Sequence, residues 1–208
     1  MLLESDNIYN LDCIEGLQLM EDESVDLVVT SPPYDELRVY GGHVWNFDIF
    51  KQIAGELFRV TCDGGYVVWI VGDSTIKGSE SGTSFKQALY FKECGFRLHD
   101  TMIYEKAGPS YPDQTRYYNT FEYMFVFSKG KPATFNPIRD RKNRWWGQKW
   151  SNTRSRRNKK GGLKVTVWDE AEGDEYGTRF NIWRYAVGYG NSGPKEMNKE
   201  HPAVFPEQ

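Results

Sequence analysis

The alternation of short apolar runs with amphipathic segments is the feature that most constrains the fold of this chain. Residues 25–30 and 66–73 are mainly apolar runs, as expected for strands covered on both faces of a sheet. Residues 47–60 place apolar side chains at helical spacing, and a Cys-Asp-Gly-Gly sequence ends that pattern. Further along, the sequence predicts a helix over 84–94 and strands over 97–105 and 121–128. This order predicts an α/β fold, a doubly wound sheet with helices on both faces.

The pattern changes after residue 130, where prolines, glycines and basic residues replace the alternation. We therefore expect an α/β core over residues 1–130 and an inserted basic lobe over 131–185, with one strand over 163–168. Residues 186–208 are predicted to form a loop and a closing segment. A chain of 208 residues can bury one substantial core.

Charge is distributed unevenly along the chain. Residues 139–160 carry ten Lys/Arg and one acid, a local charge of +9, whereas the rest of the chain carries −12. A basic segment on an acidic body indicates a surface that faces a polyanion; the alternative is a solvated loop whose tryptophans pack on the body. The candidate phosphate-contacting residues are Arg139, Arg141, Lys142, Arg144, Lys149, Arg154, Arg156, Arg157, Lys159 and Lys160.

Cysteine and histidine usage argues against a metal site. The three cysteines and three histidines are scattered, so we expect no metal cluster and no disulfide framework. The longest purely apolar run, 67–71, is too short to span a membrane, and the N-terminus lacks a signal-peptide pattern. These features predict a cytoplasmic protein with no membrane segment.

The sequence Ser31-Pro32-Pro33-Tyr34 follows the first predicted strand directly. In open α/β sheets, ligands bind beyond the carboxyl ends of the strands. Two consecutive prolines fix the backbone and remove amide donors, so this corner presents carbonyl and hydroxyl oxygens on a stiff arc. A rigid turn is the alternative interpretation of an isolated Pro-Pro-Tyr sequence.

Here the sequence resembles a known family. The stretch "DLVVTSPPY" resembles the catalytic motif of the DNA amino-methyltransferases that use S-adenosylmethionine. The stretches "ELFRVTCDGGYVVWIVGD", "FEYMFVFSKGKP" and "HPAVFPEQ" are similar to later segments of the same family, in the order of its β group. The resemblance covers nearly the whole chain and implies a Rossmann-like sheet with the basic lobe in the place of the target-recognition region.

The resemblance implies roles for individual residues. Ser31, Pro32, Pro33 and Tyr34 would form the catalytic cradle, in which the Ser31 hydroxyl and the Pro32 carbonyl accept bonds from the amino group of an extruded base and the Tyr34 ring stacks on that base. An acidic residue on a strand, here Asp12, would contact the adenosine of the cofactor. The expected S-adenosylmethionine contacts are Asp12, Cys13, Ser31, Pro32, His201, Phe205 and Pro206.

Serine in the first motif position favours cytosine N4 in double-stranded DNA as the target. Adenine N6 is the nearest alternative, and related motifs modify RNA and proteins. A catalytically inactive or split-enzyme DNA-binding fragment is the alternative from another functional class. The sequence also leaves open the recognition sequence and any restriction partner.

One motif of the family is missing from residues 1–208, the Phe-x-Gly-x-Gly turn that holds the cofactor. Residues 188–193 read Gly-Tyr-Gly-Asn-Ser-Gly, but the prolines at 194 and 202 leave little room for the helix that a phosphate-binding turn requires. We therefore expect an incomplete sheet whose open edge takes a second polypeptide or copy, and weak binding of S-adenosylmethionine. A truncated chain, half of a split enzyme and a homo-oligomer remain open.

Overall fold

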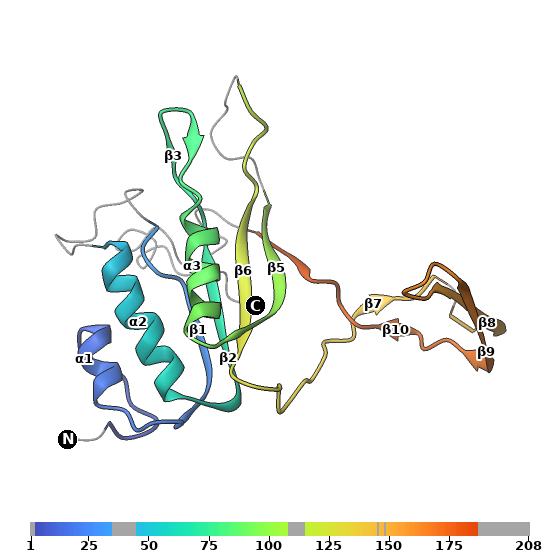
Figure 1. Ribbon diagram of the computed structural model, residues 1–208, viewed down its shortest axis with the longest axis horizontal. Helices are drawn as coiled ribbons and strands as arrows, with labels where there is room; N and C mark the ends of the chain where they lie inside the picture. Colours follow the sequence, from blue (N-terminus) through green and yellow to red (C-terminus); the bar gives the residue numbers. More distant parts are fainter. Residues whose placement is uncertain (1–2, 35–44, 108–114, 145, 148, 187–208) are drawn as a thin grey trace. The chain divides into compact units, whose positions relative to one another are not determined.

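A computed structural model describes residues 3–34, 45–107, 115–144, 146–147 and 149–186 (Figure 1). It divides into two compact units. The sheet unit comprises Met1–Phe135 and Asn181–Gln208, and the hairpin unit comprises Asn136–Phe180. Residues 131–135 and 181–185, which we assigned to the basic lobe, thus fall within the sheet unit.

The sheet unit is built on a five-stranded sheet with the order β1-β2-β6-β5-β11. β6 is antiparallel to both of its neighbours, whereas β1 pairs parallel with β2 and β11 pairs parallel with β5. The sheet is therefore mostly parallel. Its strands are β1 (Val25–Thr30), β2 (Thr61–Val71), β5 (Arg97–Ala107), β6 (Phe121–Ser128) and β11 (Ile182–Ala186). A short hairpin, β3 (Thr75–Ile76) and β4 (Ser79–Glu80), follows β2.

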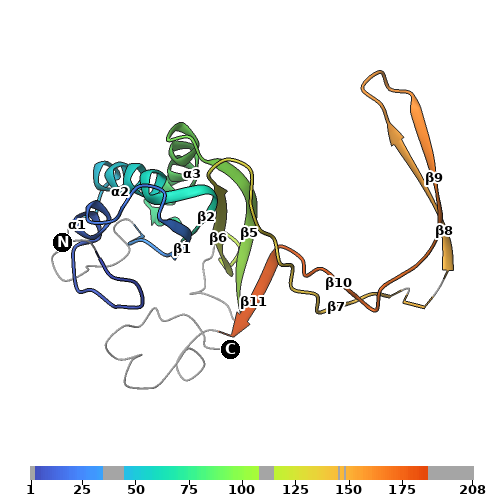
Figure 2. The ribbon, with the colours of Figure 1, turned by 90° about the horizontal axis from the view of Figure 1, so that it is seen from below.

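Three helices cover one face of this sheet (Figure 2). They are α1 (Cys13–Gln18), α2 (Phe47–Val60) and α3 (Thr83–Glu93). Phe50 of α2, Phe91 of α3 and Trp69 of β2 meet in a single buried cluster, in which aromatic rings lie 5.1–5.7 Å apart. The predicted α/β, Rossmann-like fold class is confirmed. The expectation of helices on both faces is met on one face only within the described residues.

Local chemistry fixes the ends of the helices. The Asn46 side chain accepts from the Asp48 and Ile49 amides and caps α2. After α3 the chain turns at Gly95, whose φ of +112° is unfavourable for other residues. A Cβ there would come within 2.8 Å of the Phe58 ring, so close packing of α2 also requires glycine at this position.

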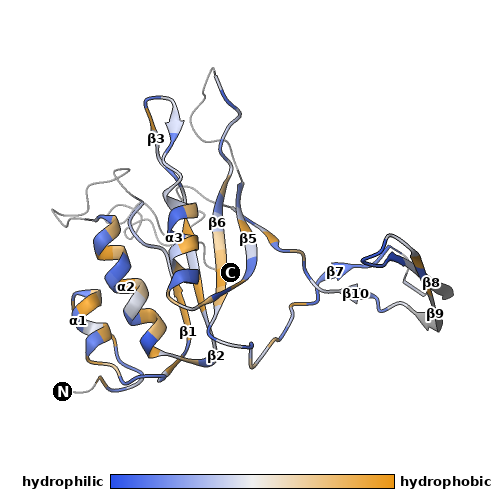
Figure 3. Ribbon diagram, in the orientation of Figure 1, coloured by the Kyte–Doolittle hydropathy of each residue, from blue (hydrophilic) through white to orange (hydrophobic). Residues whose placement is uncertain are grey.

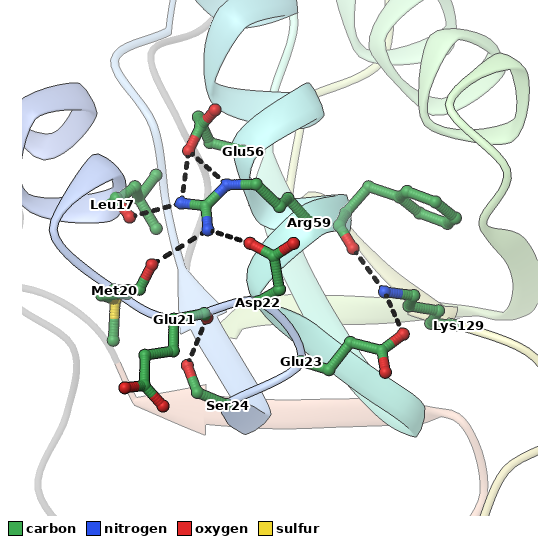
Figure 4. Close-up of polar contacts among 10 residues, drawn as sticks. Leu17, Met20, Glu21, Asp22, Glu23, Ser24, Glu56, Arg59 and Lys129 are labelled. Carbon is green, nitrogen blue, oxygen red and sulfur yellow. Dashed lines mark hydrogen bonds and ion pairs between the residues drawn. The ribbon is translucent and has the colours of Figure 1, made fainter.

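Arg59 of α2 anchors the segment that leads into β1 (Figure 4). Its guanidinium donates to the Leu17 and Met20 carbonyls at 2.7 and 2.9 Å, and it pairs with Asp22 and Glu56. These bonds hold the end of α1 and the turn before β1 against α2. The start of β1, and with it the position where β1 ends, is thereby set relative to the helical layer.

β1 forms one edge of the described sheet. Leu27 and Val29 are 56% and 60% exposed, and they alternate with Val28 along the strand, so they project from the opposite face to Val28. Val28, on the other face, packs against the core. An exposed apolar strand at a sheet edge is a potential site for a further strand.

The hairpin unit contains two pairs of antiparallel strands, β7 (Arg141–Lys142) with β10 (Tyr176–Gly177), and β8 (Lys149–Arg157) with β9 (Leu163–Glu172). The β8–β9 turn is organised by Asn158, whose side chain accepts from the amides of Lys160 and Gly162 at 3.0 and 2.9 Å. Polar residues dominate the described parts of this unit (Figure 3). We predicted one strand here, over 163–168; β8 was missed because a basic, polar segment lacks the apolar alternation of a half-buried strand.

None of the helices in the described ranges has the length and apolar character that a membrane crossing requires.

Candidate active site and nucleic-acid interface

The sheet topology brings four chain segments together at one end of the sheet. β1, β2 and β5 run in the same direction, so their carboxyl ends share an edge. β6 runs the opposite way, so its amino end lies at that edge as well. Ser31 follows β1, Gly72 follows β2, Lys106 is near the end of β5, and Glu122 is near the start of β6. This is the position at which open α/β sheets bind ligands.

A chain of hydrogen bonds links these segments. Ser31 Oγ donates to Tyr34 Oη at 3.1 Å, and Tyr34 Oη donates to Glu122 Oε2 at 2.8 Å. The other carboxylate oxygen of Glu122 accepts from Lys106 Nζ at 3.1 Å. The chain thus runs from the hydroxyl of Ser31 to an ion pair between two neighbouring strands.

The predicted catalytic residues occupy an ordered corner. Pro32 is buried, whereas Ser31, Pro33 and Tyr34 are half-buried. The Tyr34 ring lies against Gly72, where a Cβ would be 3.4 Å from Cε2, and it also packs on the hydrophobic core. The structure therefore holds the Tyr34 ring in place by packing at its side and a hydrogen bond at its tip.

Sequence reasoning missed Glu122 and Lys106. Glu122 sits in the apolar run 121–128 and is 88 residues from Tyr34, so nothing local connects it with the motif. The available signal was the single charged residue in a mainly apolar strand, since a charge in such a strand needs a partner.

Tyr104 of β5 lies beside this ion pair. Burial, with smaller contributions from the charge of Glu122 and from Tyr185, raises the pKa of Tyr104 to about 12. Its ring stacks on that of Tyr185 in β11, with centroids 5.2 Å apart. A phenol with this pKa is neutral at physiological pH, so Tyr104 adds no charge next to the ion pair.

Asp73, directly after β2, has a structural role. Its Oδ1 accepts from the Ser84 amide at 2.9 Å and from Ser81 Oγ at 3.0 Å. The N-cap residue of α3, Gly82, has no side chain for capping, so Asp73 supplies the missing acceptor from the segment that follows β2.

The structure corrects the predicted position of Asp12. It is not on a strand; it is the exposed N-cap of α1, and its Oδ1 accepts from the amides of Ile14 and Glu15 at 2.9 and 3.4 Å. Cys13 is the exposed first residue of that helix. Three predicted cofactor contacts, His201, Phe205 and Pro206, lie outside the described residues.

The predicted phosphate-contacting residues fall into two groups. Arg139 and Arg141 bind within the hairpin unit: Arg139 pairs with Asp174 at 3.2 Å, and Arg141 donates to the Thr178 carbonyl and lies 4.7 Å from the centroid of the Phe180 ring. The second group is exposed, and for none of its members does the described part of the chain provide an ion pair. It consists of Lys142, Arg156, Arg157, Lys159 and Lys160.

Three predicted contacts fall in neither group. Arg144 is exposed and has an interaction of its own. Lys149 and Arg154 lie on β8, but their side chains are outside the description.

Comparison with known proteins gives a family match over most of the chain. A family model described as "DNA methylase", for N6 and N4 methyltransferases, matches residues 25–208. The orphan methyltransferase M.BamHII of Bacillus amyloliquefaciens is 54% identical over 187 residues, which are 90% of this chain and 69% of that protein. The type II beta methyltransferase M.BslI of Bacillus sp. (strain NEB-606) is 29% identical over 151 residues.

Among solved structures, the PvuII DNA methyltransferase (cytosine-N4-specific) has a TM-score of 0.60 and 19% sequence identity. The match covers 95% of this chain and 65% of that chain, and at this identity it supports the fold alone. The match covers only 16% of M.BslI. Both M.BslI and the PvuII enzyme therefore contain substantial segments outside the region that matches this chain.

Proposed function

Because the chain belongs to the DNA methylase family of S-adenosylmethionine-dependent amino-methyltransferases, we propose that it methylates the exocyclic N4 of cytosine in double-stranded DNA. The observation that carries this proposal is the position of Ser31. It is the first residue of the Ser-Pro-Pro-Tyr motif and follows β1 at the ligand-binding end of the sheet, where its hydroxyl bonds to Tyr34. Serine at this position favours cytosine over adenine, the second base that the family modifies.

The proposed chemistry depends on hydrogen-bond acceptors. The exocyclic amine of cytosine is a poor nucleophile because its lone pair is delocalised into the ring. If Ser31 Oγ and the Pro32 carbonyl accept hydrogen bonds from its two N–H groups, the nitrogen can pyramidalise and its lone pair becomes available for attack. When bound, S-adenosylmethionine supplies a methyl group carried on a positively charged sulfur. The methylated nitrogen then loses a proton.

The described residues include a carboxylate that suits the polar groups of S-adenosylmethionine. Asp12 is an exposed carboxylate whose two capping bonds are both on Oδ1. A carboxylate of this kind suits the hydroxyl and ammonium groups of S-adenosylmethionine. The proposal therefore keeps Asp12, Cys13, Ser31 and Pro32 as cofactor contacts, with Asp12 acting from the start of α1.

The hairpin unit is the proposed DNA-binding region. Arg156 of β8 faces Lys164 of β9 across the strand pair, and like charges at directly opposite positions destabilise a pair of strands. A bound polyanion would relieve this repulsion. The major groove of B-DNA is wide enough for a two-stranded ribbon, so the exposed cations near the β8–β9 turn are proposed to contact phosphates there.

The edge of the sheet at β1 is the proposed attachment site for a second polypeptide or for a second copy of this chain. Support comes from Leu27 and Val29, which leave an apolar surface exposed at that edge. Light scattering with and without S-adenosylmethionine tests this part of the proposal: a mass that stays monomeric under both conditions argues against a second copy at the edge.

Ser31→Ala tests the main proposal. Removing one transition-state hydrogen bond typically lowers a rate by about 10²- to 10³-fold, so we expect a loss of that order in methyl transfer to DNA, with salt-dependent DNA binding unchanged. Ser24→Ala is the matched control, because Ser24 lies at the opposite end of the same strand and bonds to the Glu21 carbonyl (Figure 4).

Nucleoside mass spectrometry of the treated DNA identifies the modified base. N4-methylcytosine supports the proposal, and N6-methyladenine would replace it with the second activity of the family. Wild type and Ser31→Ala that both bind DNA and both lack transfer would indicate a DNA-binding fragment instead.

A further inference from the structure

The hydrogen-bond chain from Ser31 to Lys106 has a fixed direction. The Glu122 carboxylate, ion-paired with Lys106, has no hydrogen to donate, so Tyr34 must donate in the 2.8 Å bond between them. A phenol has one hydrogen, and Tyr34 Oη can therefore only accept from Ser31 Oγ at 3.1 Å. The hydroxyl hydrogen of Ser31 is thus committed, and Ser31 Oγ offers lone pairs to any further partner.

We propose that Glu122, held in place by Lys106, is a positioning residue that sets this direction and keeps the Ser31 oxygen an acceptor toward the amino group of the target base. The inference rests on the proposed role of Ser31 in methyl transfer. The direction matters because a Ser31 hydroxyl that donated instead would bind the nitrogen lone pair and block its attack on the methyl group.

Burial strengthens the arrangement. The side chains of Glu122 and Lys106 are only 19% and 28% exposed. Hydrogen bonds away from bulk water are electrostatically stronger, and successive bonds in a chain polarise one another. A change in the donor or acceptor character at Glu122 is therefore transmitted through Tyr34 to Ser31.

Glu122→Gln should reverse the chain. Lys106 carries only donors, so it will hold the carbonyl oxygen of the glutamine and turn the amide NH₂ toward Tyr34. Tyr34 must then accept, and its own hydrogen is directed to Ser31. In the double variant Glu122→Gln/Lys106→Met, the glutamine can rotate its carbonyl back to Tyr34, which restores the original direction. Lys106→Met by itself keeps the carboxylate and so keeps the direction.

A second variant reverses the chain while preserving the ion pair. The charge swap Glu122→Lys/Lys106→Glu places an ammonium group, which can only donate, against Tyr34. It keeps one positive and one negative side chain between β5 and β6, so it provides a folded protein if Glu122→Gln does not fold.

The readout is the NMR resonance of Tyr34 in protein labelled with ¹³C at the ζ-carbon of tyrosine, assigned with Tyr34→Phe. This resonance reports whether the phenol donates or accepts, and it needs no methyl transfer. We expect wild type, Lys106→Met and the Gln/Met double variant to have the same Tyr34 chemical shift. Glu122→Gln and the charge swap should both move this chemical shift, and in the same direction as each other. A Tyr34 resonance unchanged in the reversed variants, or a double variant that matches Glu122→Gln, would overturn the proposal.

The rate of methyl transfer should divide the variants into the same two groups as the Tyr34 resonance. The loss of one transition-state hydrogen bond typically costs about 10²- to 10³-fold, so we expect Glu122→Gln to lose about 10²-fold and the double variant to recover most of that loss. A purely structural role for the ion pair predicts the opposite, a double variant worse than either single one. Absence of transfer in wild type would contradict the proposed function, whereas the NMR comparison would still decide the direction of the chain.

Discussion

The two units of this protein place their charged groups in different surroundings. In the sheet unit, Glu122 and Lys106 are partly buried, and their bonds reach Ser31 through Tyr34. In the hairpin unit, Arg156, Lys159 and Lys160 are exposed, and the described residues offer them no ion pair. The charged groups of the sheet unit are therefore paired with each other, whereas these three cations of the hairpin unit present charge that a polyanion can neutralise. Substitutions matched between the units can test this contrast.

The largest difference should come from the hydrophobic core. Phe91 is 0% exposed and contacts the rings of Phe50, Trp69 and Phe127, whereas Phe180 of the hairpin unit is 66% exposed. We expect Phe91→Ala to lower the free energy of unfolding by about 3–5 kcal/mol and Phe180→Ala by less than about 1 kcal/mol. Denaturant titration measures both, and equal losses would show that the hairpin unit also depends on a packed core.

Tyr104 should make the sheet unit sensitive to alkali. Its folded pKa, raised mainly by burial to about 12, lies above the unfolded value of about 10. The resulting stabilisation is complete below pH 10 and is lost as pH rises through the folded pKa, a loss of about 2 kcal/mol by pH 12. In Tyr104→Phe, stability should fall less over this range.

Stability as a function of pH, measured by denaturant titration, tests this prediction, with Tyr176→Phe in the hairpin unit, where the tyrosine is 43% exposed, as the control. Identical alkaline profiles for wild type and Tyr104→Phe would contradict the assignment.

Charge removal at the β8–β9 turn should weaken DNA binding. If Lys159 and Lys160 each neutralise a phosphate, Lys159→Gln/Lys160→Gln reduces the slope of log K against log[salt] by about 2. Lys92→Gln/Lys131→Gln is the matched control, because it removes the same charge from exposed positions in the sheet unit, at the end away from Ser31.

Fluorescence anisotropy at several salt concentrations measures both slopes. If the control pair changed the slope as much as the hairpin pair, the binding would follow total charge and the hairpin would have no special role.

The smallest effect should come from the ion pair between Arg179 and Asp140 in the hairpin unit. The Arg179 guanidinium holds the pKa of Asp140 below its usual range. A carboxylate whose pKa is lower in the folded than in the unfolded state stabilises the fold at pH values above its unfolded pKa. This stabilisation is lost as pH falls through the folded pKa. Asp140→Asn should therefore slightly reduce the hydrogen-exchange protection of β7 and β10 near pH 7 and leave it unchanged in acid. A protection difference that persists at low pH would assign the effect to packing instead.

Much of the sheet unit could be predicted from sequence. The apolar runs and helical spacing gave β1, α2 and β6 with the bounds that the structure has, because each element is defined by a local period. Two features could not be predicted this way. β11 joins the sheet beside β5, about 80 residues away, and Asp12 caps α1 where we had placed it on a strand.

The sequence by itself determined β1, α2 and β6, the rigid Ser-Pro-Pro-Tyr corner after β1 and the concentration of positive charge over residues 139–160. Those are properties of neighbouring residues, so local patterns carry them. Only the tertiary structure decided that Glu122 meets Tyr34 and that Lys106 meets Glu122. These contacts arise because β6 inserts in reverse between β2 and β5 and brings its first residues to the carboxyl ends of its neighbours, and no local period records which strands pair.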